Sequence, residues 1–188
     1  SRDWSSDVCS SDLANVGLYS VYAAKKGIRV RAFEPSVFNL EFLARNINLN
    51  EVSDLVTIVP VAVGGEGVSS SKLNLSSTAW GDSQNSFGTL HGQFGVDISS
   101  NFNYEVLGVS LDALVKTLHL AQPNFIKIDV DGIEPEILES GALVLREVQS
   151  VLVECPAYEG GEKRVRLSLE SAGLRLERVD GRNEIWVR

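Results

Sequence analysis

Short apolar runs alternate with segments of helical periodicity along most of the chain. Runs rich in β-branched residues predict strands at 28–33 (IRVRAF), 55–63 (LVTIVPVAV), 124–130 (NFIKIDV), 150–155 (SVLVEC) and 174–179 (LRLERV). Apolar residues at helical spacing predict helices at 17–26, 36–50, 110–118, 134–147 and 159–172. Strands separated by helices indicate an α/β fold whose open sheet is mostly parallel, with helices on both faces and right-handed crossovers.

Residues 64–104 interrupt this alternation, because the segment is rich in Ser, Gly and Asn. A loop of that length without its own secondary structure is unusual inside a compact domain. Two interpretations stay open. Residues 71–76 (SKLNLS) and 103–109 (NYEVLGV) form a small extra pairing with a substrate-facing loop between them, or the whole segment is a plain surface loop.

The C-terminus carries a hairpin signal. The sequences LRLERV (174–179) and NEIWVR (183–188) flank Asp180-Gly181-Arg182. Asp-Gly between two apolar alternating runs is among the strongest short-range hairpin signals. We therefore expect the last strand to run antiparallel beside the parallel sheet.

Composition narrows the class of protein. The chain has 188 residues, of which 44% are apolar and 22% charged, as expected for one globular domain with a sizeable core. It contains no apolar run of about 18 residues and no signal-peptide pattern, so we expect no membrane span and a cytoplasmic location. The net charge of −8 argues against nucleic acid as the main partner. Cys9 and Cys155 offer neither a disulfide framework nor metal-ligand spacing.

The N-terminal segment does not fit the rest of the pattern. The stretch from Asp3 to Leu13, DWSSDVCSSDL, resembles a short-read sequencing adapter translated in one frame, and the chain contains no methionine. We interpret residues 1–13 as a non-native segment that reads as neither strand nor helix cap. We expect a single domain over 14–188 whose first strand is missing or replaced. The alternative is a native Ser/Asp-rich loop.

Two features suggest an adenosine-containing cofactor. The ANVG turn (14–17) directly precedes the first predicted helix, where small residues permit close backbone approach and N–H groups await a partner. Glu34 stands at the end of the second predicted strand, and its two oxygens can accept hydrogen bonds from both hydroxyls of a ribose. A surface glutamate before Pro35 is the plainer interpretation.

Several motifs occur in an order that resembles one family. They are ANVGLYS, AFEPSVFNLEFLARNINLN, VAVG, VSLDALV and FIKIDVDGIEPEILESGA, from Ala14 to about Glu154. They resemble the FkbM-type S-adenosylmethionine-dependent methyltransferases. Asp131 stands where that family usually has glutamate. Ser11 and Leu13 stand where an acidic residue and a glycine usually precede the Ala-Asn pair.

The resemblance implies a Rossmann-like class I methyltransferase fold, in which a C-terminal antiparallel hairpin distinguishes methyltransferases from dehydrogenases. It implies methyl transfer from S-adenosylmethionine to a hydroxyl on a sugar, lipid or secondary metabolite. Within the implied site, Asn15 and Gly17 lie beside the methionine portion, Glu34 binds the ribose and Ala62 lies along the adenine. The implied cofactor-binding residues are Ala14, Asn15, Gly17, Glu34, Pro35, Ala62 and Asp129.

The candidate catalytic residues are carboxylates. Period-two alternation places Lys127, Asp129 and Asp131 on one side if the strand stays regular. Neighbouring carboxylates raise each other's pKa, so either aspartate is a candidate general base. Glu154 is a further candidate, and His91 is another if its loop closes over the substrate. Two carboxylates fall short of a usual divalent-cation ligand set, so we expect no metal.

Two other functions remain open on the sequence. A nicotinamide-dependent oxidoreductase of Rossmann type also uses a glycine-bearing turn and an acidic strand end. A non-catalytic module would keep the cofactor site but lack turnover. The expected partner is a small-molecule, glycan or lipid acceptor, without nucleic acid, and the sequence determines neither the identity of the acceptor nor the oligomeric state.

Overall fold

The computed structural model describes residues 8–11, 14–79, 81–82, 85–90, 94–95, 97 and 99–188. The larger of the two sheets in this part of the chain has seven strands. In spatial order they are β10 (Arg175–Asp180), β11 (Asn183–Val187), β9 (Ser150–Glu154), β8 (Phe125–Ile128), β1 (Val8–Ser11), β2 (Arg29–Phe33) and β3 (Val56–Val59).

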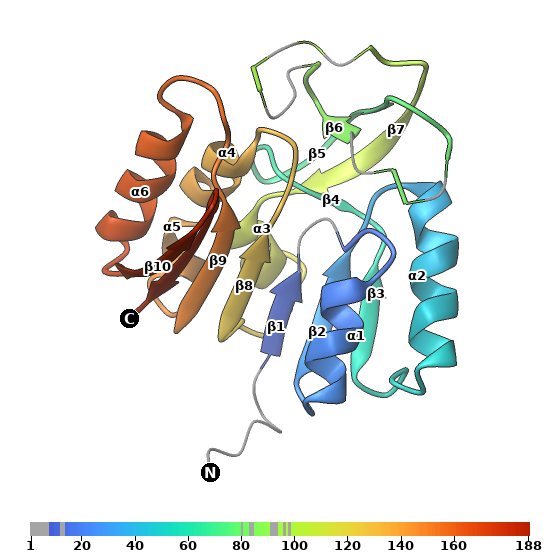
Figure 1. The fold of residues 1–188 in the computed structure, drawn as a ribbon, viewed down its shortest axis with the longest axis horizontal. Helices are drawn as coiled ribbons and strands as arrows, with labels where there is room; N and C mark the ends of the chain where they lie inside the picture. Colours follow the sequence, from blue (N-terminus) through green and yellow to red (C-terminus); the bar gives the residue numbers. More distant parts are fainter. Residues whose placement is uncertain are drawn as a thin grey trace.

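Strand direction confirms the predicted fold class (Figure 1). The pairs β1–β2, β1–β8, β2–β3 and β8–β9 are parallel, while β11 is antiparallel to both β9 and β10. Asp180 pairs with Asn183 at the tip of the predicted C-terminal hairpin. The sheet is therefore parallel except at the edge that the hairpin forms.

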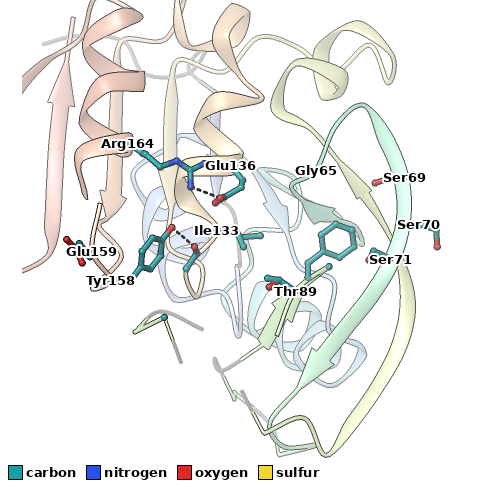
Figure 2. Close-up of a pocket in the computed structure, with 14 residues that line it drawn as sticks. Gly65, Ser69, Ser70, Ser71, Thr89, Ile133, Glu136, Tyr158, Glu159 and Arg164 are labelled. Atoms are coloured by element: carbon teal, nitrogen blue, oxygen red, sulfur yellow. Dashed lines mark hydrogen bonds and ion pairs between the residues drawn. The ribbon is translucent and has the colours of Figure 1, made fainter. Parts of the chain in front are cut away.

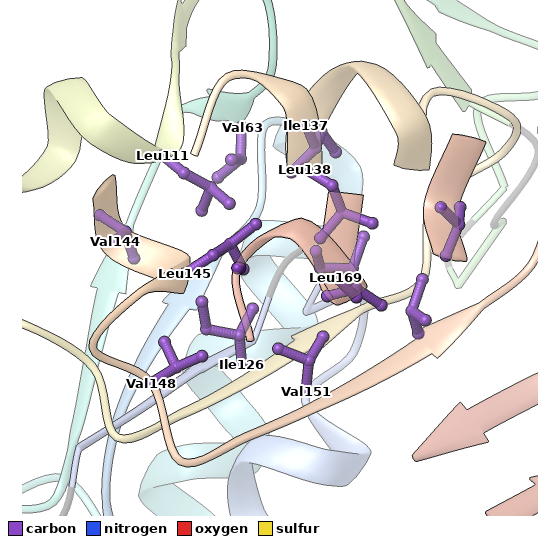
Figure 3. Close-up of a cluster of buried hydrophobic side chains, with 14 of the residues drawn as sticks. Val63, Leu111, Ile126, Ile137, Leu138, Val144, Leu145, Val148, Val151 and Leu169 are labelled. Atoms are coloured by element: carbon purple, nitrogen blue, oxygen red, sulfur yellow. The ribbon is translucent and has the colours of Figure 1, made fainter. Parts of the chain in front are cut away.

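Helices cover both faces of the large sheet. Helices α1 (Leu18–Lys25) and α2 (Val37–Leu49) pack on one face over β1 to β3. The opposite face carries α3 (Leu111–Lys116), α4 (Glu134–Glu139), α5 (Ala142–Leu145) and α6 (Gly161–Ser171). Figure 3 shows side chains from these helices converging on Ile126 and Val151 of the central strands.

Alternation along β2 supplies both cores. Val30 and Ala32 belong to the cluster under α1 and α2, whereas Phe33 belongs to the cluster on the other face. Arg29 and Arg31 alternate with the buried Val30 and Ala32, and only at Ala32-Phe33 are successive positions apolar and buried.

The segment Val8–Ser11 differs from the sequence expectation. We did not expect a strand here, yet this segment forms β1 between β2 and β8, with Cys9 paired to Val30 on one side and Phe125 on the other. The parallel neighbours present backbone N–H and C=O groups that need partners, and an extended backbone satisfies them whatever its side chains. Burial raises the pKa of the Cys9 thiol to about 11. The foreign origin of residues 1–13 stays a prediction.

A second sheet contains β4 (Ala62–Val63), β7 (Phe102–Val109), β5 (Val68–Leu75) and β6 (Asn85–Phe87), in that spatial order. Strands β5 and β7 pair antiparallel from Val68↔Val109 to Leu75↔Phe102. This pairing confirms the extra strands expected at 71–76 and 103–109. The alternative of a plain surface loop is wrong for these residues.

The predicted strand over 55–63 is two strands in the structure. Strand β3 ends at Val59, and β4 leaves the large sheet to pair with Gly108 and Val109 of β7. Pro60 lies at the break, because proline has no N–H for the ladder.

The predicted helix over 134–147 is also divided, into α4 and α5. Its break includes Gly141, where a Cβ atom would lie 2.6 Å from Leu111 Cδ1. The close approach of α3 therefore requires glycine at this position. Every helix in the described part of the chain is too short or too polar to cross a lipid bilayer.

Candidate active site

The turn from β1 into α1 is formed by residues 14–17. Ala14 N–H donates to Phe33 C=O (2.8 Å), and Gly17 N–H donates to Ala14 C=O (2.8 Å). Asn15 has φ 50° and Gly17 φ 92°, both in the left-handed region, which Asn and Gly tolerate best. This tight turn directs the Asn15 N–H toward the end of β2.

The Glu34 carboxylate accepts a hydrogen bond from this N–H group. One carboxylate oxygen accepts from Asn15 N (2.7 Å) and the other from Ser36 N (2.8 Å). The side chain is 0% exposed. Burial raises the pKa of Glu34 to about 7, although the two backbone hydrogen bonds favour the charged form and oppose the shift. Glu34 therefore stands beside the turn as predicted, but covered from solvent.

The backbone of Gly81 and Asp82 lies over the turn. Asn39 Oδ1 accepts from Gly81 N (3.0 Å), and Asn39 Nδ2 donates to Asp82 C=O (3.1 Å). Asn15 Nδ2 completes the link with a long bond to Gly81 C=O (3.4 Å). Residues from β1–α1, α2 and the β5–β6 connection thus meet around Glu34.

Pro35 and Ala62, two further predicted cofactor residues, hold structural contacts. The Tyr104 hydroxyl donates to Pro35 C=O (3.1 Å) and accepts from Val37 N (2.8 Å), which ties β7 to the start of α2. Burial raises the pKa of Tyr104. Ala62 is buried in β4 opposite Gly108.

A cleft of about 380 Å³ opens at the carboxyl ends of β1, β8 and β9. Its lining residues are Ala14, Asn15, Val16, Leu18, Tyr19, Gly81, Lys127, Asp129, Asp131 and Glu154. It unites all three predicted catalytic carboxylates, of which Asp129 is also a predicted cofactor residue, with the predicted cofactor residues Ala14 and Asn15. Gly17, Glu34, Pro35 and Ala62 are not among the lining residues.

Lys127 and Asp129 form an ion pair inside this cleft, with Nζ 2.7 Å from Oδ2. The lysine is 7% exposed, and its ammonium group lies 4.3 Å from the centre of the Tyr19 ring. Burial acts to raise the pKa of Asp129, but a hydrogen bond with Glu154 and the charges of Lys127 and Arg182 outweigh it and lower that pKa. Asp129 is therefore an ionised carboxylate at neutral pH.

Asp131 differs from Asp129 in its surroundings. Its Oδ2 accepts a long hydrogen bond from Asn85 N (3.3 Å). Burial, together with the negative charges of Asp129, Glu154 and Asp82, raises the pKa of Asp131 to about 6. Since a general base works best with a pKa near the working pH, Asp131 is better suited to that role than Asp129.

Two further carboxylates complete the surroundings. Glu154 Oε1 accepts from Arg182 Nη2 (2.6 Å), which leaves it tied to the hairpin. Glu134 is 0% exposed, and its Oε2 has no hydrogen-bond partner among the described residues. Burial raises the pKa of Glu134 to about 8, and the negative charges of Asp131 and Glu154 raise it further.

No group of three or more His, Cys, Asp or Glu side chains in the described ranges has a metal-binding arrangement. His91 lies outside the described residues.

Sequence reasoning assigned no role to Lys127, Asn39 or Tyr104. A lysine between Ile126 and Ile128 in an apolar strand is a usable signal, because an unpaired charge is rarely buried. Asn39 and Tyr104 carry no comparable signal, since their partners lie far away in the sequence.

One known protein family matches most of this chain. The family model described as the methyltransferase FkbM domain matches residues 13–176. A comparison with curated protein sequences found no match.

Solved structures of methyltransferases share the fold at low identity. The precorrin-6y C5,15-methyltransferase from Geobacter metallireducens GS-15 has 12% identity and a TM-score of 0.53, over 99% of this chain and 80% of that one. The magnesium protoporphyrin IX methyltransferase from Synechocystis PCC 6803, solved with bound SAM, has 12% identity and a TM-score of 0.54, over 97% and 69%.

A putative O-methyltransferase from Klebsiella pneumoniae has 11% identity and a TM-score of 0.51, over 96% of this chain and 72% of that one. At such identities the likeness establishes a Rossmann-like class I methyltransferase fold, and the family model adds the family. This chain belongs to the methyltransferase FkbM domain family.

Proposed function

We propose that this protein transfers a methyl group from S-adenosylmethionine to a hydroxyl oxygen of a small-molecule, glycan or lipid acceptor. The main support is the cleft at the carboxyl ends of β1 and β8, which combines the 14–17 turn with three carboxylates. Ligands of open α/β sheets bind at this edge, around the point where strand order reverses. Strand β1 lies at that point, between β2 and β8.

The residues of the cleft fit the charge of the cofactor. Asp129, Asp131 and Glu154 outnumber the single lysine, which suits a ligand carrying a sulfonium and an ammonium group. Asn15 Oδ1 is buried without a hydrogen-bond partner among the described residues, and Asn15 lines the cleft. Such an oxygen can accept from the ammonium group, which would remove the cost of leaving it unpaired.

Glu34 would hold the ribose. Its two oxygens accept one backbone N–H each and the carboxylate also bonds with the Asn39 side chain. A carboxylate has about four lone-pair sites, so acceptor capacity remains for a ribose hydroxyl. Because Glu34 is fully buried, this role requires residues around it to move. Gly81 and Asp82 are bound to Asn39 and Asn15 near Glu34 by three hydrogen bonds, at 3.0, 3.1 and 3.4 Å, which are ordinary or long.

The chain's own contribution to chemistry is orientation and a base. When bound, S-adenosylmethionine supplies the methyl group, whose bond to sulfur breaks as the new oxygen–carbon bond forms. Asp131 accepts the proton of the acceptor hydroxyl at a carboxylate oxygen, and its pKa of about 6 keeps it mostly ionised at neutral pH. Lys127 holds Asp129 in place, so that Asp129 can orient the ammonium group or the hydroxyl.

We also propose a cytoplasmic location and an acceptor that is not a nucleic acid. Cys9 and Cys155 are not joined in a disulfide, which suits a reducing compartment, and a net charge of −8 disfavours contact with a phosphate backbone.

Calorimetry with S-adenosylhomocysteine, the demethylated product, tests the cofactor assignment. Asp129→Asn and Glu34→Gln should each weaken binding by about tenfold or more, because each removes a charge-assisted hydrogen bond. Glu41→Gln, which removes an equal charge from the exposed side of α2, should leave binding unchanged. Circular dichroism verifies that each variant is folded. Binding of NAD but not of S-adenosylhomocysteine by the unaltered protein would overturn the proposal in favour of an oxidoreductase.

The base assignment predicts a different pattern for Asp131→Asn. Turnover should fall about 10²-fold or more while affinity for S-adenosylhomocysteine changes little. In the unaltered protein, activity should decline on the acid side with a midpoint near pH 6, and the variant should lose this limb. An unchanged profile in the variant would transfer the role to Glu154.

A further inference from the structure

A second and larger cavity, of about 790 Å³, lies between the second sheet and helices α4 and α6 (Figure 2). It adjoins the cofactor cleft through the segment that follows β8. Asp131 lines the cleft, whereas the next two residues, Gly132 and Ile133, line the larger cavity. The proposed base thus stands at the border between two spaces, and the larger one is within the size range of small-molecule sites.

Two aromatic rings, one from β6 and one from the segment before α6, give this cavity fixed apolar surface. The Phe87 ring packs so closely on Gly108 that a Cβ atom there would lie 2.2 Å from the ring. The Tyr158 hydroxyl donates to Gly132 C=O (3.2 Å), which holds that ring in one orientation. Ile133 adds apolar surface beside Gly64. Held rings of this kind offer flat apolar surface at little entropic cost.

The second sheet, which supplies Phe87, also brings hydroxyl groups to the cavity. Ser69 and Ser71 alternate with Ser70 along β5, so the first two share one face of the strand. Both are half-buried, and neither hydroxyl is hydrogen-bonded within the described part of the chain. The exposed Ser70 instead donates to Glu105 Oε2 (3.0 Å). Two hydroxyls are therefore available to a ligand.

The charges around the cavity disfavour an anionic ligand. Arg164 contacts Glu136 and Glu139, each at 2.7 Å, so its charge is already compensated. Glu136 and Glu159 both line the cavity, and Arg164 is the only cation among its described lining residues. A phosphate, sulfate or carboxylate would meet two carboxylates and a neutralised arginine.

We propose that this cavity binds the methyl acceptor and that the acceptor is an uncharged glycoside. Its apolar parts would pack against Tyr158 and Phe87 while its hydroxyls hydrogen-bond with Ser69 and Ser71. A hydroxyl directed past Gly132 would reach the carboxylate of Asp131. This inference rests on the proposed function, since it takes the smaller cleft as the cofactor site.

The test measures binding of p-nitrophenyl β-D-glucopyranoside, which is neutral and has one apolar ring, by saturation-transfer NMR and calorimetry. Glucose 6-phosphate serves as the anionic comparison. The double variant Ser69→Ala/Ser71→Ala and the variant Tyr158→Ala should each weaken glycoside binding by about fivefold or more. Ser70 also lines the cavity, but its hydroxyl is bonded to Glu105 on the other face of β5. The matched control Ser70→Ala should therefore bind as the unaltered protein does.

Three outcomes would overturn the proposal: tighter binding of glucose 6-phosphate, absence of glycoside binding, or equal weakening in Ser70→Ala. Calorimetry with S-adenosylhomocysteine on the same samples distinguishes a wrong acceptor class from a wrong cofactor assignment. Cofactor binding without glycoside binding rejects the acceptor class alone. Glycoside binding without cofactor binding rejects the proposed function, although the cavity would still be a glycoside-binding site.

Discussion

At the scale of single residues, the site depends on backbone shapes that few side chains permit. Asn15 and Gly17 both adopt left-handed φ angles within one short turn. That turn sends the Asn15 N–H to Glu34, so the conformation of one residue positions the carboxylate of another. Gly17 has a second constraint, since a Cβ atom there would lie 2.6 Å from Cδ1 of the buried Leu43.

Gly17→Ala should therefore destabilise the protein through strain and overpacking together, by about 2–4 kcal/mol. Gly27→Ala is the matched control, because Gly27 has a similar φ of 83° but open space around its Cβ position. Its cost should be limited to the strain of about 1 kcal/mol. Urea unfolding of both variants measures the difference, and equal losses would contradict the packing of α2 against the turn.

At the scale of elements, a buried polar link joins α6 to the C-terminal hairpin. Glu184 in β11 is 2% exposed and accepts hydrogen bonds from the Arg166 guanidinium of α6. The indole N–H of the buried Trp186 donates to its other oxygen (2.9 Å). The antiparallel strand is thus held both by its ladder with β9 and by this carboxylate.

Arg166→Ala should lower the free energy of unfolding by roughly 2–4 kcal/mol, because it leaves the carboxylate of Glu184 buried without its cation. Arg166 is itself 39% exposed, which places the effect toward the lower end of the range for buried pairs. Glu162→Ala removes the exposed partner of the same arginine and should cost less than about 0.5 kcal/mol. Chemical denaturation distinguishes the two, and similar losses would show that Glu184 contributes no more than a surface charge.

At the scale of the whole molecule, carboxyl groups with raised pKa gather at one edge of the large sheet. The pKa is about 7 for Glu34, about 6 for Asp131 and about 8 for Glu134, in each case chiefly through burial. A carboxyl whose pKa is higher folded than unfolded contributes stability fully present below its unfolded value. That contribution is lost as pH rises through the folded value.

The protein should consequently be more stable near pH 5 than near pH 8. Asp129, whose pKa is lowered, acts in the opposite sense, but its transition lies below pH 4 and does not affect this window. Unfolding free energies measured in urea at pH 5, 6.5 and 8, at constant ionic strength, should decrease in that order. Glu134→Gln should flatten the decrease most at its alkaline end. A slope equal to that of the unaltered protein would exclude Glu134 as a source.

Much of the fold and part of the site follow from the sequence by itself. Local periodicity located the alternating strands and helices, and Asp180-Gly181 marked the hairpin, because both depend on residues close together in the chain. The order of motifs identified the family, and the three candidate carboxylates do meet in one cleft. Their convergence was predictable because the carboxyl ends of neighbouring parallel strands share an edge.

Only the tertiary structure decided the rest. It placed Val8–Ser11 as a central strand, divided 55–63 between two sheets and buried Glu34 completely. It also set Ser69 and Ser71 opposite Tyr158 around a second cavity. The physical reason is common to all four. Each of these features depends on contacts between residues that are distant in the sequence, and packing of the whole chain selects those contacts. The sequence pattern reports only how each segment alternates between burial and exposure.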